Sequence, residues 1–117
     1  MQKEARLTRQ ADFSKVMSQG KNWADSLVAI RIVSNGLLIS RFGFSVSKRV
    51  GNAIVRNKVK RRLREVVRSN TITTGWDVLI IARRNARYAE FNELGSSVKH
   101  LLHRSRILRP NNEHHYL

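Results

Sequence analysis

The segment from Ser45 to Arg68, SVSKRVGNAIVRNKVKRRLREVVR, carries the strongest structural pattern in the chain. Gly51-Asn52 marks a turn, and the residues after it repeat with the period of an α-helix. The opposite sides of this helix differ sharply, because one side is apolar and the other is almost wholly basic. The apolar side chains recur at the spacings that form one stripe: Val55, Val59, Leu63, Val66 and Val67. We predict a helix over 53–68 that packs this stripe on a sheet and presents its basic face outward.

Strands are expected on both sides of this helix. Within residues 41–47, RFGFSVS, apolar side chains alternate with small ones, which predicts a strand with one face in the core. The other face carries Ser45 and Ser47, and it is either open to a ligand or simply solvated. The apolar run VLIIA at 78–82 predicts a central strand buried on both faces. Together these segments predict a β-α-β unit over 42–83.

Two further helices are expected near the ends of the chain. An amphipathic helix is predicted over 7–19, with Gly20 suited to its C-terminal cap. A closing helix is predicted over 91–102, with Phe91 among the apolar side chains of its buried face. We expect residues 110–117 to form a flexible tail.

A strand rich in β-branched residues is predicted over 27–33, and Asn35-Gly36 follows it directly. This dipeptide is the strongest short-range signal for a hairpin, so we expect a further strand to begin near Leu37. The predicted fold is therefore α+β, a sandwich of order αβββαβα around a central sheet. We expect it to form a single RNA-binding domain over 1–109.

Composition restricts the function. The 117 residues include 23 Lys and Arg against 8 Asp and Glu, a net charge of +15, which implies a polyanionic partner. Arg outnumbers Lys by 16 to 7, and its planar guanidinium suits phosphates and bases, so nucleic acid is favoured. The absence of Cys excludes disulfides, thiol catalysis and Cys-ligated metals. No apolar run approaches the roughly 20 residues that span a bilayer, and no secretory signal is visible, so we expect a cytoplasmic protein.

The basic residues around the predicted helix form a candidate phosphate-binding surface. They share a helical face, asparagines are interleaved with them, and the turn at Gly51-Asn52 leaves backbone amides available to phosphate. A solvated charge run is the alternative. The predicted RNA-binding residues are Lys48, Arg49, Asn52, Arg56, Asn57, Lys58, Lys60, Arg61, Arg62, Arg64 and Arg68.

The segments SKRVGNA at 47–53 and VRNKVKR at 55–61 resemble the basic signature helix of the protein subunit of bacterial ribonuclease P. The resemblance extends to Asp12-Phe13, to FSVS at 44–47 and to IIAR at 80–83, and it covers about residues 5–105. The match is specific because it fixes the turn, the asparagines and the basic positions together.

This resemblance implies an accessory subunit of a ribonucleoprotein endoribonuclease. Its partners would be the catalytic ribonuclease P RNA, one protein copy per RNA, and precursor tRNA, whose 5′ leader is removed by phosphodiester hydrolysis. Catalysis would be the work of the RNA, with Mg²⁺ bound by RNA and no catalytic or metal-binding residue in the protein. The family's strand-helix-strand crossover is left-handed, against the general rule for such connections.

The resemblance also implies a cleft along the open sheet face for the single-stranded leader. Phe13 and Met17 would line it, and Ser45 and Ser47 lie on the same open face. Relatives often carry aromatic residues where this chain has Met17 and Arg31. A guanidinium can stack on a base and bind phosphate, whereas a plain core role suits Met17 equally well.

Other classes fit parts of the pattern. A ribosomal or other structural RNA-binding protein fits a basic α+β domain, whereas a protein for double-stranded DNA lacks a helix-turn-helix spacing. The pairs His100/His103 and His114/His115 lack a third ligand, and the acidic residues are scattered, so neither a zinc site nor a protein-only nuclease is expected. Four aromatic residues are expected to pack rather than to stack on bases: Trp23, Phe42, Trp76 and Phe91.

Overall fold

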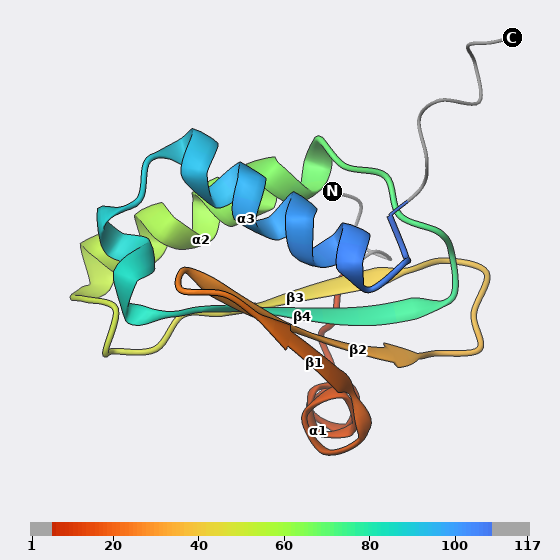
Figure 1. Ribbon diagram of the computed structural model, residues 1–117. Helices are drawn as coiled ribbons and strands as arrows, with labels where there is room; N and C mark the ends of the chain where they lie inside the picture. Colours follow the sequence, from red (N-terminus) through yellow and green to blue (C-terminus); the bar gives the residue numbers. More distant parts are fainter. Residues whose placement is uncertain (1–5, 109–117) are drawn as a thin grey trace, which may run out of the picture.

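The computed structural model describes residues 6–108, which form three α-helices, one short 3₁₀ helix and four strands (Figure 1). The element order αβββαβα agrees with the prediction, but the strands do not all match: no strand begins near Leu37, and the strand at 21–24 was not predicted. In chain order the elements are α1 (Gln10–Gln19), β1 (Lys21–Ala24), β2 (Val28–Ser34), β3 (Arg41–Ser45), α2 (Ala53–Arg68), β4 (Trp76–Ala82), the 3₁₀ helix η2 (Arg84–Tyr88) and α3 (Phe91–Arg104).

The strands form one mixed sheet in the order β1-β2-β4-β3. Strand β2 is antiparallel to both of its neighbours, whereas β3 is parallel to β4. Helices α2 and α3 cover one face of the sheet and α1 lies on the other (Figure 1). Figure 1 also shows that β3 and β4 both run leftward, with α2 above them and β4 in front of β3. The β3-α2-β4 crossover is therefore left-handed, as the family resemblance implied.

The main core lies between the sheet and the layer of α2 and α3. Strand β4 is central and buried on both faces, as predicted, with Val78 and Leu79 on opposite sides. Helix α2 has the predicted bounds, and its apolar stripe is buried apart from Val55, which is half-buried. The largest fully buried side chains come from β2, α2, β4 and α3: Ile30, Leu63, Ile80, Leu94, Leu101 and Leu102.

A smaller apolar cluster joins α1 to the other face of the sheet. It contains Leu7, Val16 and Leu79, with the ring of Phe13 packed against it. Gly43 of β3 permits this close approach, because a Cβ atom at that position would lie 2.7 Å from Cε1 of Phe13. Helix α1 begins at Gln10 and not at position 7, since the backbone N–H of Leu7 donates to the Phe42 carbonyl instead (2.9 Å).

The predicted hairpin at Asn35-Gly36 is wrong, because β4 lies between β2 and β3. The Asn35 side chain instead shapes an excursion of the chain. Its Oδ1 accepts a hydrogen bond from the Leu37 backbone (2.7 Å), and its Nδ2 donates to the Ile39 carbonyl (3.1 Å). Its backbone N–H donates to Gly75, which precedes β4, so this loop pairs with a segment distant in sequence.

The actual hairpin joins β1 to β2 through Asp25, and the sequence analysis did not identify β1. One carboxylate oxygen of Asp25 accepts hydrogen bonds from the backbone N–H groups of Leu27 and Val28. The Ser97 hydroxyl donates to its other oxygen. Burial alone raises the pKa of Asp25, but these hydrogen bonds and the charge of His100 outweigh it, so the pKa lies below its ordinary value. The turn is thus held from both the hairpin and α3.

Other boundaries differ by a few residues. Strand β3 ends at Ser45, so Ser47 lies in the following turn, and α3 continues to Arg104. Phe91 is the first residue of α3 and is 42% exposed, which corrects its predicted place on the buried face. Within residues 6–108, no helix is both long and apolar enough to cross a membrane. The predicted tail over 110–117 falls outside the described range.

Candidate nucleic-acid interface

The turn before α2 is rigidly held. Asn52 is the N-cap of the helix, and its Oδ1 accepts a hydrogen bond from the Val55 backbone N–H (3.0 Å). Val50 is fully buried and fixes the turn to the core. The side chains of Lys48 and Arg49, between the strand and this anchor, are exposed. The predicted phosphate-binding turn therefore presents two cations from a fixed backbone.

Helix α2 presents its basic residues outside its buried stripe: Lys58, Arg61 and Arg68 are exposed, whereas Lys60 and Arg64 are half-buried on the flank beside β3. Three arginines of the helix bind other groups of the protein. Arg56 donates to the Gly51 carbonyl (3.2 Å), Arg62 donates to the Ala89 carbonyl (3.0 Å), and Arg68 forms an ion pair with Glu65 (2.7 Å). These three arginines thus have partners inside the protein: two within α2 and the turn before it, and one in the residue that follows η2.

The remaining cations have no hydrogen-bonded or ionic partner within residues 6–108. We call them the basic face: Lys48, Arg49, Lys58, Lys60, Arg61 and Arg64. Asn57 is exposed on the same side of α2. Like charges three and four residues apart repel along a helix, by a few tenths of a kcal/mol per pair, so this face favours an external anion.

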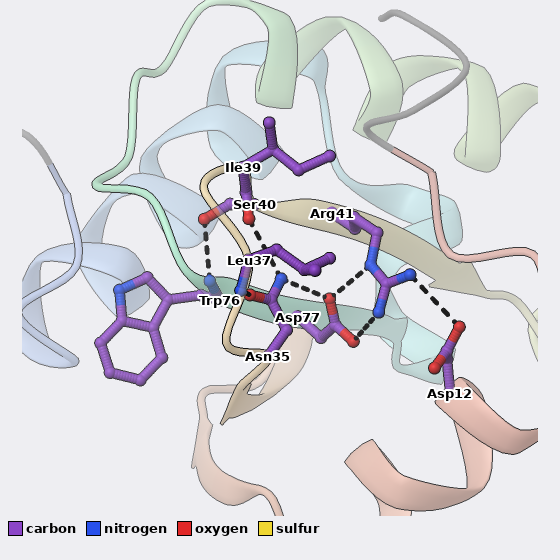
Figure 2. Close-up of polar contacts among 8 residues, drawn as sticks. All are labelled: Asp12, Asn35, Leu37, Ile39, Ser40, Arg41, Trp76 and Asp77. Atoms are coloured by element: carbon purple, nitrogen blue, oxygen red, sulfur yellow. Dashed lines mark hydrogen bonds and ion pairs between the residues drawn. The ribbon is translucent and has the colours of Figure 1, made fainter.

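Two aspartates, Asp12 and Asp77, share the guanidinium of Arg41. Asp77 is 2% exposed and receives two hydrogen bonds from Arg41, at 2.8 and 2.7 Å, and one from Asn35 at 2.9 Å (Figure 2). The same guanidinium lies 3.3 Å from Asp12 of α1. The hydrogen bonds to Asp77 raise the pKa of Arg41 against the opposing effect of burial. The network joins α1, β3, β4 and the loop after β2.

No group of three or more His, Asp or Glu side chains in the part described by the structure is placed to hold a metal ion. Asp12 and Asp77 are separated by the Arg41 guanidinium that both contact. His100 and His103 are exposed on α3, while His114 and His115 lie outside the described range. Asp12 and Asp77 are therefore engaged by a cationic side chain.

The predicted leader-binding residues lie on the α1 side of the sheet. Phe13 is half-buried against the sheet, Met17 is 50% exposed, and Ser45 and Ser47 are exposed. Exposure argues against a plain core role for Met17. Beyond α1 the sheet face carries a row of small or half-exposed side chains in register: Ala24, Ala29, Ile81 and Ser45. This part of the face is open, as the alternation in β3 allows.

Arg31, which the sequence suggested as a leader contact, donates hydrogen bonds to the end of α1. Its Nε donates to the Val16 carbonyl (3.3 Å) and one terminal nitrogen donates to the Gly20 carbonyl (2.9 Å). These acceptors lie at the C-terminal end of α1, where a cation also suits the helix dipole. Arg31 therefore holds in place the helix that carries Phe13 and Met17.

A hollow of about 170 Å³ connects the two predicted surfaces, and the sequence analysis did not find it. It lies at the outer edge of β3, between Gly43 and Phe44 of that strand, Phe13 of α1, and Lys60 and Arg64 of α2. The segment 6–8 closes one side. Three aromatic residues and three cations, Arg6 among them, thus line one space, a combination that suits a nucleotide.

Comparisons with known proteins show which family the chain matches. A model of the ribonuclease P family matches residues 1–106. The chain is 42% identical over 113 residues to a ribonuclease P protein component of Dehalococcoides mccartyi, covering 97% of this chain and 94% of the relative. It is 40% identical over 104 residues to that of Clostridioides difficile, covering 86% and 91%.

Solved structures show the same fold. The RNase P protein of Staphylococcus aureus superposes with a TM-score of 0.81 at 30% identity, covering 90% of this chain and 98% of that one. The RNase P protein of Thermotoga maritima superposes with a TM-score of 0.78 at 30% identity, covering 85% and 96%.

Proposed function

The chain belongs to the ribonuclease P protein family, and from this premise we propose how it engages RNA. It is the protein component of a ribonucleoprotein endonuclease of tRNA 5′ maturation, and its partner is ribonuclease P RNA. In our proposal the basic face binds the catalytic RNA, and the α1 side of the sheet binds the 5′ leader of precursor tRNA. One protein copy acts per RNA, in the cytoplasm. Because the chain belongs to this family, we set aside the two alternative hypotheses, a structural RNA-binding protein and a DNA-binding protein.

One observation carries the first part of this proposal: six cations of the turn and of α2 have no hydrogen-bonded or ionic partner within the described range. Lys48 and Arg49 project from a turn fixed by buried Val50, and Lys60 and Arg61 project from a helix whose other side is buried in the core. Because the backbone under these cations is already fixed, only their side chains have to be ordered when phosphates bind, and their positions set the register of the RNA.

The other predicted contacts keep a supporting place in the proposal. Asn52 and Arg56 hold the helix start, and Asn57 lies exposed between the cations. Arg62 and Arg68 have internal partners, so their binding to RNA would add to a structural role.

We assign Mg²⁺ to the RNA and not to the protein. The carboxylates of Asp12 and Asp77 do not fit a magnesium site, because both contact the Arg41 guanidinium. RNA phosphates provide the oxygen ligands that this hard cation prefers. In this proposal the protein contributes binding and orientation of RNA and precursor, and no protein group takes part in the hydrolysis.

The leader site rests on the surface beside α1. Phe13 faces the hollow that Lys60 and Arg64 also line, so a base and a neighbouring phosphate can be held there together. Met17, Ser45 and Ser47 extend this surface along the open sheet face. A leader contact by Arg31 stays a prediction. Its bonds to the end of α1 support a positioning role for Phe13 and Met17.

Single-turnover cleavage of precursor tRNA at low Mg²⁺ tests the assignment. The reactions contain bacterial ribonuclease P RNA alone, the protein alone, or both, and only the combination should cut efficiently at the mature 5′ end. A protein that binds the RNA without changing cleavage would refute the proposed role.

The salt dependence of RNA binding tests the basic face. If about six phosphates are neutralised, the logarithm of the association constant should fall with the logarithm of salt concentration at a slope near −5. The double variant Lys60→Ala/Arg61→Ala should reduce the magnitude of the slope by about two. The control Lys99→Ala/Arg104→Ala removes the same charge from the exposed side of α3 and should change it little. A flat salt response of the unmodified protein would contradict the proposal.

A further inference from the structure

The short helix η2 presents an exposed aromatic residue covered by a cation. Tyr88 is 74% exposed, and the Arg87 guanidinium lies 5.0 Å from the centre of its ring. The helix is firmly anchored, because Ala86 is fully buried and Ala89 directly after η2 is 6% exposed. Arg87 and Tyr88 therefore project from a fixed backbone, and one face of the ring is covered by Arg87.

The charge around this ring is positive. Arg83, Arg84 and Arg87 are exposed, and none has an acidic partner within residues 6–108. Arg83 donates to the backbone carbonyl of Asp25. Glu90, two residues after Tyr88, is engaged in the capping box of α3. An exposed tyrosine among arginines that form no ion pair is poorly explained by folding, since the ring buries little apolar area and the arginines add to the net positive charge.

The position of η2 links it to the basic face. Strands β3 and β4 are parallel, so the turn that carries Lys48 and the start of η2 follow strand ends at the same edge of the sheet. The hydrogen bond from Arg62 to the Ala89 carbonyl fixes the end of η2 against α2. Lys58 lies one helical turn before Arg62 on that flank. In Figure 1, η2 is the cyan turn between β4 and α3, beside the first half of α2.

We propose that η2 is a second RNA contact, at which an unpaired base stacks on the Tyr88 face that Arg87 leaves open and Arg84 binds an adjacent phosphate. This inference rests on the proposed function. Stacking on an aromatic ring backed by a guanidinium is the chemistry that holds single-stranded nucleotides, whereas a paired duplex offers no free base face. The nucleotide belongs to the catalytic RNA or to precursor tRNA, and the two sources share this chemistry.

Two binding measurements distinguish the sources. The first is the affinity of the protein for ribonuclease P RNA, and the second is the affinity of the assembled holoenzyme for precursor tRNA. Tyr88→Ala should weaken one of them about fivefold or more, while Tyr88→Phe, which keeps the ring, should stay within about twofold of the unmodified protein. Weakening of the first affinity identifies the catalytic RNA as the source, and weakening of the second alone identifies the precursor.

Arg87→Ala should weaken the same affinity as Tyr88→Ala, whereas Arg104→Ala removes an exposed arginine at the far end of α3 and should not. Both positions of η2 are exposed, so thermal unfolding should be unchanged in all of these variants. If Tyr88→Ala and Arg87→Ala leave both affinities unchanged, the inference is wrong. Lys60→Ala/Arg61→Ala in the same assay shows whether the proposed function fails with it, because that variant weakens binding only if the basic face is correct.

Discussion

Replacing Arg41 with Met should destabilise the protein severely, because it leaves a buried carboxylate without its main partner. The Asp77 side chain is 2% exposed and receives two hydrogen bonds from Arg41 but only one from Asn35. Removing one member of a buried ion pair costs about 3–5 kcal/mol, and the remaining amide offsets a small part of that. We expect a loss of about 3 kcal/mol, a large share of the roughly 5–15 kcal/mol that stabilises a typical domain.

Urea unfolding followed by circular dichroism measures this loss. The control Asp12→Asn keeps the shape of the side chain and removes only the longer contact to Arg41, at 3.3 Å, so it should cost less than Arg41→Met. The double variant Arg41→Met/Asp77→Asn removes both charges and should be more stable than Arg41→Met alone. A loss below about 1 kcal/mol for Arg41→Met, or a double variant no more stable than the single one, would refute the role assigned to this network.

Three further predictions concern the surroundings of the site. Gly43→Ala places a Cβ 2.7 Å from the Phe13 ring, so it should lower the free energy of unfolding in urea by about 1–3 kcal/mol and weaken leader-dependent affinity. An unchanged free energy of unfolding would show that the ring moves freely. Arg31→Met removes two charged hydrogen bonds from the end of α1 and should cost about 2 kcal/mol in the same assay, whereas loss of leader affinity at full stability would favour a direct contact. The lowered pKa of Asp25 makes its carboxylate stabilising above its ordinary pKa of 3.8, and this stabilisation is lost as pH falls through the folded-state pKa. Ser97→Ala should therefore destabilise the protein near neutral pH and progressively less in acid, and a difference independent of pH would contradict this coupling.

The parts of the fold that the sequence predicted well are those with a local and repeated signal. The bounds of α2 were predicted correctly because its apolar stripe and its capping Asn52 are both local features. Strand β4 was recognised because burial on both faces leaves a continuous apolar run. The predicted hairpin at Asn35-Gly36 was wrong because β2 pairs with β1 on one side and on the other with β4, whose residues lie more than 40 positions away. Strand β1 was missed because its four residues, KNWA, carry no alternation.

The candidate site shows the same division. The basic face could be predicted from one helix, because side chains at fixed spacings share a side of it. The hollow beside Phe13 could not, since it brings together the segment 6–8, α1, β3 and α2. The capping role of Arg31 also required the tertiary structure, because the carbonyls that it binds, at the end of α1, lie 15 and 11 residues before it.

One side of helix α2 stabilises the fold by burying apolar side chains, and its other side destabilises the free protein by bringing like charges together. Val59, Leu63, Val66 and Val67 bury the stripe that fixes the helix on the sheet, and this packing determines where every basic side chain points. Opposite them, repulsion among like charges lowers the stability of the free protein, and only Glu65 on the helix offsets it. Like charges this close on a helix are locally unfavourable, and their presence on a helix that the core fixes is expected of a functional site. The repulsion is relieved when phosphates bind, so part of the affinity for RNA derives from strain that the core already sustains in the free protein.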